Sequence, residues 1–365
     1  MIELSGQIMS RNIAVATIKD GIITNSLAAL LPLYLKRTGD VESWLASRAI
    51  DSHRANSRLL KKALRLTSAS DAEIVLKVNA VTITDTYWFR EDGGSLTYED
   101  VRFKRNMFDK LALSGDPDSF NQQLSPTPEL TNIGSFEKCW RLEDGKWWMI
   151  KQGSELERFS ELFICRLGQM LGFPMADYQL DGDNTIKSPD FTNGASVNYE
   201  AAAGIVGDDE DYIFNFNTFW NISPKLAKQY LQTIYLDTIC FNMDRHTQNY
   251  GILRDVSSGE IISMAPNFDN NIAMFARGIP KNLDRQNDKL IELFCELLEK
   301  DNRALEMASG FPRPSREIIE QCIDRTETEI DSEIVCRFII SGTEQVHENI
   351  RQLQQGLYME VQLEP

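Results

Sequence analysis

The sequence predicts an α+β fold with two lobes, a small antiparallel β lobe and a larger, mainly helical lobe, preceded by an N-terminal α+β region. Short stretches of alternating apolar and polar residues between 146 and 200 indicate the strands. Long stretches of helical period after residue 223 indicate the helical lobe. We therefore expect an N-terminal region at 1–125, a small lobe at 126–205 and a large lobe at 206–365.

Length and composition are those of an ordinary globular protein. The chain has 365 residues, of which 42% are hydrophobic and 25% charged, enough for two or three domains. It contains no apolar run of about 18 residues, which a membrane helix needs, and its start has no signal-peptide pattern. The six cysteines are scattered and resemble buried reduced thiols. We expect a cytoplasmic protein that does not enter a membrane.

The net charge of −16 disfavours binding to nucleic acids and to anionic membranes. One predicted helix, 52–66, nevertheless follows another at 41–49 and carries Arg54, Arg58, Lys61, Lys62 and Arg65. This pair is either a DNA-binding helix-turn-helix or, as is more usual for such a face, simply solvated. Three strands are expected after it, near 74–78, 81–84 and 87–90, followed by a linker at 114–128.

The small lobe is expected to begin with a glycine turn between strands. Residues 131–140 contain this turn, and the strand at 146–151 ends in Lys151. Such a turn covers a nucleotide when its backbone N–H groups approach the phosphates and a lysine adds positive charge. The residues predicted to cover the nucleotide are Gly134, Ser135, Phe136 and Lys138.

A helix at 154–172 follows, with Ser154 as N-cap, Glu157 completing a capping box and Gly172 as stop signal. Its apolar face is predicted from Leu156, Phe159, Phe163, Leu167 and Met170. Strands at 185–188 and 196–200 complete the lobe. The backbone of Glu200 and Ala201 is then expected at the hinge, where it would meet adenine.

The strongest signal lies at 241–271. A helix with Ser223 as cap and Pro224 as first residue delivers the chain to Asp244. Asn249 follows, then strands at 250–253 and 261–264, then Asp269. The hairpin would bring Asn249 and Asp269 together as oxygen ligands for Mg²⁺, with Asp244 left to accept a proton, as phosphoryl transfer to a hydroxyl requires. The alternative for each residue alone is a turn or a helix cap.

These residues resemble the HipA family of bacterial Ser/Thr kinases. Three patterns match: Asp-x-His-x-x-Asn at 244–249 followed by Phe268-Asp269, Gly-x-x-x-Lys at 134–138, and E-L-x-x-x-R-L-x-x-x-L-G at 161–172. The resemblance implies a distant protein-kinase-like fold, ATP and Mg²⁺ as cofactors, and a protein substrate with a Ser or Thr. Asp244 would orient the hydroxyl, His246 would face the γ-phosphate, Asn249 and Asp269 would hold metal, and Glu161 would orient Lys151 over the phosphates.

The resemblance also implies self-phosphorylation near the nucleotide loop, where Ser125, Thr131 and Ser135 are the candidate hydroxyls. It further suggests a small antitoxin-like partner. Two alternatives stay open: a phosphoinositide or other small-molecule kinase, which the net charge of −16 disfavours, and a DNA-associated toxin–antitoxin component whose catalytic step is secondary. Further helices are expected at 288–300, 315–325 and from 331 onward.

Overall fold

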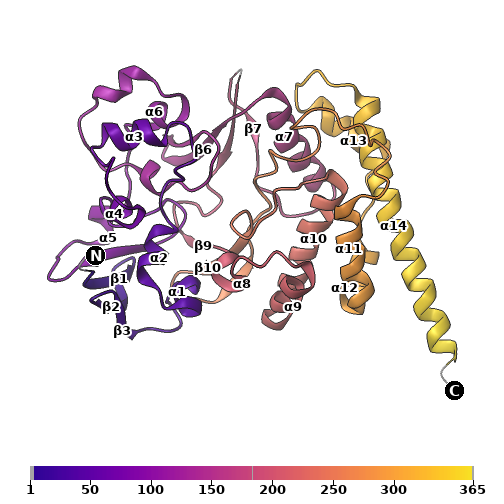
Figure 1. The fold of residues 1–365 in the computed structure, drawn as a ribbon, viewed down its shortest axis with the longest axis horizontal. Helices are drawn as coiled ribbons and strands as arrows, with labels where there is room; N and C mark the ends of the chain where they lie inside the picture. The colour runs from indigo at the N-terminus through magenta and orange to yellow at the C-terminus, as the bar shows by residue number, and fades with distance from the viewer. Residues whose placement is uncertain (1–3, 183, 364–365) are drawn as a thin grey trace. The chain divides into compact units, whose positions relative to one another are not determined.

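The protein is described by a computed structural model that covers residues 4–182 and 184–363 (Figure 1). Internal contacts divide the chain into two compact units. Unit 1 consists of Met1–Gly153, Gln179–Ile205 and Gly251–Ile262. Unit 2 consists of Ser154–Tyr178, Val206–Tyr250 and Ser263–Pro365. The three-part division expected from the sequence stays a prediction.

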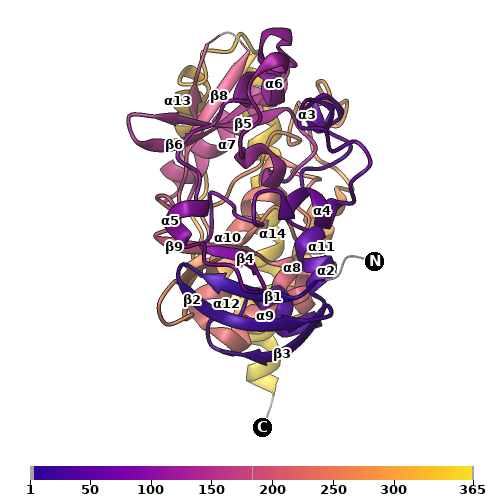
Figure 2. The ribbon, with the colours of Figure 1, turned by 90° about the vertical axis from the view of Figure 1, so that its left-hand side faces the viewer.

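Unit 1 opens with a four-stranded antiparallel sheet (Figure 2). Its strands are β1 (Gly6–Ser10), β2 (Ile13–Lys19), β3 (Ile22–Ser26) and β4 (Tyr87–Glu91), in the order β3-β2-β1-β4. Only β4 was predicted. Its partner β1 lies about 80 residues earlier in the chain, so the sheet depends on non-local pairing.

Short helices follow the first three strands. They are α1 (Leu33–Thr38), α2 (Val41–Ala46), α3 (Ser57–Ala63), α4 (Asp71–Leu76), α5 (Tyr98–Val101) and α6 (Asp109–Ser114), with 3₁₀ turns η1 (Pro117–Asn121) and η2 (Pro128–Thr131).

The prediction of a strand at 74–78 is wrong, because these residues lie in and just after α4. Ser70 accepts the N–H of Glu73 and Glu73 accepts that of Ser70, a capping box that starts the helix. The strand predicted at 81–84 is also absent from this described segment. The helix predicted at 52–66 is shorter, and Arg54 lies before it, in the interior. Arg54 is therefore part of neither a solvated nor a DNA-binding face.

The second sheet of unit 1 contains β5 (Lys138–Glu143), β6 (Lys146–Gln152), β7 (Gln179–Leu180) and β8 (Thr185–Pro189), in the order β5-β6-β8-β7. It shares a hydrophobic core with the N-terminal segment, since Trp140 of β5 and Leu130 belong to the same buried cluster as Met9, Leu60 and Trp88. The first 125 residues and the predicted small lobe are thus packed on each other within unit 1.

The third sheet contains β9 (Val197–Ala201), β10 (Gly251–Asp255) and β11 (Ile261–Met264), in the order β11-β10-β9. The predicted hairpin is confirmed. Its turn forms because the Asp255 carboxylate accepts the N–H groups of Ser257 and Ser258, and Gly259 has a positive φ of 75°. The hairpin makes up most of the chain between residues 249 and 267, so these two positions are separated by few residues.

Unit 2 is mainly helical (Figure 1). Its helices are α7 (Glu155–Met170), α9 (Tyr212–Ile222), α10 (Pro224–Cys240), α11 (Lys289–Lys300), α12 (Asn302–Ser309), α13 (Arg316–Asp324) and α14 (Ser332–Leu363). The short α8 (Ala203–Val206) lies where the chain passes from unit 1 to unit 2. No helix in the described ranges has the length and apolarity needed to cross a membrane.

Local signals predicted two of these helices well. Ser154 and Glu157 form the expected capping box of α7, and Ser223 caps α10. On α7, Phe159, Phe163 and Leu167 of the predicted apolar face are buried, Leu156 is half-buried and Met170 is 41% exposed. The six cysteines are free thiols, five of them buried and Cys295 partly so.

Candidate functional site

The loop that carries Asp244 is closed by its own hydrogen bonds within unit 2. Helix α10 ends at Cys240, and the next residue, Phe241, turns the chain with a φ of 54°. The N–H of Asp244 then donates to Asn242 Oδ1 at 3.1 Å. Asn249 Nδ2 donates to the carbonyl of Asp244 at 2.9 Å. Because the Asn249 nitrogen is used in this way, its side-chain oxygen faces elsewhere and is available as a ligand.

The electrostatics of Asp244 suit a proton acceptor. Partial burial raises the pKa of its carboxyl, and the negative charge of Asp269 raises it further, while His246, Arg245 and Arg277 act in the opposite direction. A carboxylate with a raised pKa is a better base at neutral pH than an ordinary aspartate. The mutual effect of the two acids also places Asp269 within electrostatic reach of Asp244.

Arg245 connects the loop to the segment that carries Asp269. Its Nη1 donates to the carbonyls of Asn249 and Phe268, each at 2.7 Å. One nitrogen therefore brings together the backbone of Asn249 and that of Phe268, the residue before Asp269. Asp269 itself has a φ of 64°, unusual for a residue other than glycine. Such a conformation persists only where the surroundings impose it, as they often do at functional sites.

The rest of the Arg245 guanidinium is buried and ion-paired. It makes two bonds to Asp237 on α10, at 2.8 and 2.9 Å, and the side chains are 3% and 0% exposed. Its Nη2 also donates to the side-chain oxygens of Asn267 and Asn270. Sequence reasoning missed both Arg245 and Asp237. The available signal was an acid in the apolar last turn of α10, eight residues before an arginine in the loop.

Glu161 on α7 is fully buried and supports the same segment. Its Oε1 accepts the N–H of Asn270 at 2.9 Å, one residue after Asp269. The predicted pairing of Glu161 with Lys151 involves residues of both units and stays a prediction.

His246 is half-buried, so its ring is not enclosed in the core. Its Nδ1 accepts the N–H of Gln248 at 3.3 Å. The neutral ring therefore carries its proton on Nε2, a donor suited to a phosphate oxygen.

The donor set fits Mg²⁺ bound together with a nucleotide. Mg²⁺ prefers oxygen ligands and is usually held by one or two carboxylates, phosphates and water. Asn249 and Asp269 supply one amide and one carboxylate. Among the described residues no group of three or more His, Cys, Asp or Glu side chains gathers as a metal cage would. Phosphate oxygens would therefore complete the coordination.

The predicted nucleotide-covering residues, at 134–138, lie in unit 1. Gly134 has a φ of 109°, which favours glycine, and a Cβ there would collide with Lys138 Nζ. Lys138 on β5 is directly opposite Lys151 on β6, and they are only 8% and 6% exposed. Ser135 is exposed and Phe136 half-buried.

The predicted hinge residues lie on β9. The Glu200 carboxylate contacts Arg254 and accepts bonds from the Leu33 N–H and the Tyr87 hydroxyl, all within unit 1. The side chain is therefore occupied by structural contacts. The prediction for Glu200 and Ala201 concerned their backbone groups and stays a prediction.

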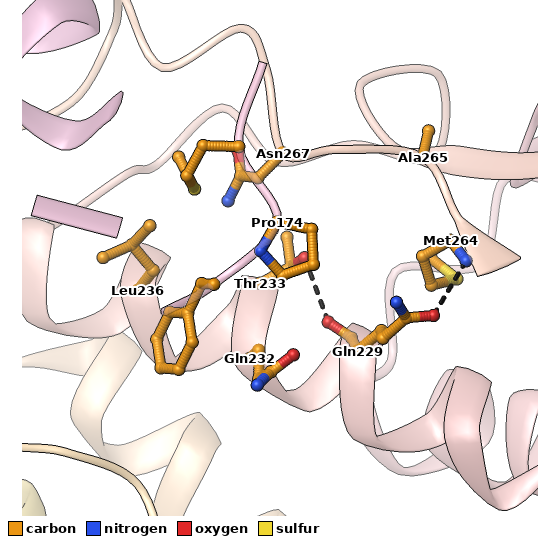
Figure 3. A pocket seen from close by; sticks show the side chains of 10 residues that line it. Pro174, Gln229, Gln232, Thr233, Leu236, Met264, Ala265 and Asn267 are labelled. Atoms are coloured by element: carbon orange, nitrogen blue, oxygen red, sulfur yellow. Dashed lines mark hydrogen bonds between the residues drawn. The ribbon is translucent and has the colours of Figure 1, made fainter. Parts of the chain in front are cut away.

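A pocket lies in unit 2 between α10 and the segments around Pro174 and Ala265, with an empty volume of about 250 Å³ including open solvent (Figure 3). Gln229 and Thr233 of α10 line it, and Gln229 accepts the N–H of Met264. Asn267 also lines it, and its buried Nδ2 has no partner in the described structure. None of the predicted site residues lines the pocket.

The chain matches solved structures, whereas no family model and no curated protein matches it. It is similar to the HipA protein of Shewanella oneidensis MR-1, solved with HipB and operator DNA, with a TM-score of 0.56 and 13% identity over 96% of this chain and 99% of that one. The chain has the HipA fold. It is also similar to the Helicobacter pylori proinflammatory kinase CtkA, with a TM-score of 0.47 and 21% identity over 62% of this chain and 95% of that one. The fold expected from the resemblance is thus confirmed.

Proposed function

We propose that the protein is a HipA-like kinase that transfers the γ-phosphoryl group of Mg-ATP to a Ser or Thr hydroxyl of a protein. The observation that carries this proposal is the position of Arg245, which binds the backbones of Asn249 and Phe268 with one nitrogen. It thereby links the loop that carries Asn249 and Asp244, an acid with a raised pKa, to the residue before Asp269, and an amide and a carboxylate suit Mg²⁺.

In the proposed reaction, the substrate hydroxyl oxygen forms a bond to the γ-phosphorus while the bond from that phosphorus to the β–γ bridging oxygen breaks. Asp244 orients the hydroxyl and takes its proton, and ADP leaves. Mg²⁺ held by Asn249 and Asp269 would neutralise charge on the phosphates. His246 Nε2 donates to a γ-phosphate oxygen.

Unit 1 supplies the remaining nucleotide contacts in this proposal. Residues 134–138 cover the phosphates, and Lys151, oriented by Glu161, adds positive charge beside them. The backbone of Glu200 and Ala201 meets adenine.

Self-phosphorylation is part of the proposal because the family resemblance implies it. Of the three candidate hydroxyls, only Ser135 is exposed. Thr131 is buried and donates to the carbonyl of Val81, and Ser125 Oγ is buried. A phosphate of about −1.5 to −2 charges at Ser135 would repel a triphosphate.

The HipA structure was solved with HipB and operator DNA. By analogy, we propose that this chain binds a small antitoxin-like partner and that it acts in the cytoplasm.

Exchange of Asp244 tests the function directly. Asp244→Asn should abolish transfer from labelled ATP to proteins of a host lysate while ATP affinity stays within a few-fold of wild type, because this acid acts on the hydroxyl. Asp269→Asn should lose Mg²⁺-dependent ATP binding as well. Asp284→Asn, an exposed acid of the same unit, is the matched control. Near-full turnover by Asp244→Asn would show that the catalytic loop is wrongly assigned.

A further inference from the structure

Arg54 is a fully buried cationic side chain of unit 1 that the reaction above does not use. It is 1% exposed. Its Nε and Nη2 donate to the carbonyl of Gly134 at 3.2 and 3.1 Å, and Nη2 also donates to that of Asn132 at 2.6 Å. Its Nη1 donates to the carbonyl of Lys138 at 3.2 Å. All three guanidinium nitrogens are thus bound to carbonyls of residues 132–138.

These bonds determine which way the neighbouring N–H groups face. The chain has no cis peptide bond in its described part, and in a trans peptide the C=O and the following N–H point in opposite directions. Because the carbonyls of Asn132 and Gly134 point to Arg54, the N–H groups of Ile133 and Ser135 point away from it.

Three consecutive amides of this loop are also unused. In the described structure the N–H groups of Gly134, Ser135 and Phe136 donate to no protein group. Consecutive free N–H groups form a concave site for anions. Lys138 and Lys151, opposite each other on β5 and β6, add positive charge to the same strands.

The residues packed around Arg54 and the loop come both from the N-terminal region, 1–125, and from the segment that follows it. The buried Glu129 carboxylate lies 3.9 Å from Arg54 Nη1 and accepts the N–H of Trp140 at 2.7 Å. It also accepts bonds from the side chains of Asn106 and Asn132. Asn56 Nδ2 holds Glu137 of the loop at 2.7 Å. The N-terminal region therefore supplies Arg54, Asn56 and Asn106 to the backing of the loop.

We propose that Arg54 is a positioning residue for the triphosphate: by holding the carbonyls of residues 132–138, it keeps the N–H groups of the loop directed at the phosphates. This inference rests on the proposed ATP binding. It assigns to the N-terminal region a role in nucleotide affinity. Since Arg54 acts only through phosphate-facing N–H groups, its effect depends on the number of phosphates in the ligand.

The experiment compares Arg54→Met and Arg54→Lys with Arg48→Met. Arg48 is the matched control, because it is also buried in unit 1 and donates to two carbonyls, those of Ala80 and Tyr87, besides its bond to Asp85. Calorimetric titration of each full-length variant with ATP, ADP and adenosine, all with Mg²⁺, gives the three affinities, and thermal unfolding gives the stability.

Arg54→Met should weaken ATP binding by about tenfold or more, ADP binding by less, and adenosine binding by less than about twofold. Arg54→Lys keeps the charge but not the fork of donors, so its ATP affinity should be intermediate. Arg48→Met should lower the unfolding temperature and leave ATP affinity unchanged. Where Arg54→Met does not fold, Arg54→Lys decides in the same way.

Wild-type-like ATP affinity of the Arg54 variants would overturn the inference while leaving the proposed function intact. Equal losses for ATP and adenosine, or an equal loss of ATP affinity in Arg48→Met, would overturn it too, since both would indicate a merely structural role. Failure of the wild-type protein to bind ATP would instead remove the proposed function, and this inference with it.

Discussion

Two buried arginines, one in each unit, hold the loops that carry the candidate site, and they do so by different electrostatic means. Arg245 in unit 2 makes two charge-assisted bonds to Asp237, at 2.8 and 2.9 Å. Arg54 in unit 1 is bound mainly by carbonyl oxygens, with the nearest carboxylate, Glu129, 3.9 Å away. The loop with Asp244 is thus fixed through the ion pair of Arg245 with Asp237. Residues 132–138 are instead fixed by hydrogen bonds between the Arg54 guanidinium and their neutral carbonyl groups.

The protonation equilibria reflect this difference. For Arg245, burial lowers the pKa, but the charge and hydrogen bonds of Asp237 outweigh it and the pKa is raised. For Arg54, burial prevails over the attraction of Glu129 and the pKa is lowered. Burial also raises the pKa of Glu129 to about 7. Unit 2 should therefore be sensitive to the loss of a charge, and unit 1 to pH near neutrality.

The largest expected effect is that of Asp237→Asn. It leaves the Arg245 charge buried without its partner, which typically costs about 3–5 kcal/mol. We expect a large fall in the free energy of unfolding of unit 2, measured by denaturant titration, together with loss of phosphoryl transfer.

Arg337→Ala is the control for that variant. It removes a bidentate pair with Asp284, at 2.7 Å for both bonds, that is exposed on the surface of the same unit. Surface pairs contribute little, so its stability should not change measurably. Equal effects of the two substitutions would contradict the importance assigned to the buried pair.

A smaller effect is expected from Glu129, through pH. Its folded pKa of about 7 lies above the ordinary 4.5, so the folded state binds more protons in this interval. The stability it contributes is complete below pH 4.5 and is lost as the pH rises through about 7. Between pH 5.5 and 8 unit 1 should lose about 2 kcal/mol, measured by hydrogen exchange of the amides of β5 and β6. Glu129→Gln should remove this dependence, and a slope that survives the substitution would refute the assignment.

The smallest effect, of opposite sign, is expected from His347 on α14 in unit 2. It is 2% exposed, with Nε2 2.9 Å from the Tyr235 hydroxyl. Burial, with Arg313 nearby, lowers the pKa from 6.5 to about 4, so its contribution to stability is complete above pH 6.5 and is lost as the pH falls through about 4. Hydrogen exchange of α10 and α14 should show a loss of about 1 kcal/mol from pH 7 to 5.5, absent in His347→Asn. If both units weakened in the same direction, the contrast between them would be wrong.

The sequence by itself determined the elements whose signals are local. The caps Ser154 and Ser223, the hairpin turn at Asp255 and the spacing from Asp244 to Asn249 involve bonds between residues at most five positions apart, so they can be read along the chain. The same reasoning, applied to Ser70 and Glu73, would have identified α4.

Tertiary structure alone decided how the site is supported. Arg54 reaches carbonyls 78 to 84 residues further along the chain, and Arg245 reaches Asn267 and Phe268 22 and 23 residues away. From the sequence alone, neither arginine can be distinguished from an ordinary charged residue on the surface. Burial removes water as a partner, and a guanidinium in the interior must then find its acceptors on whatever backbone packs around it. That choice depends on the packing of distant segments, which no local pattern encodes.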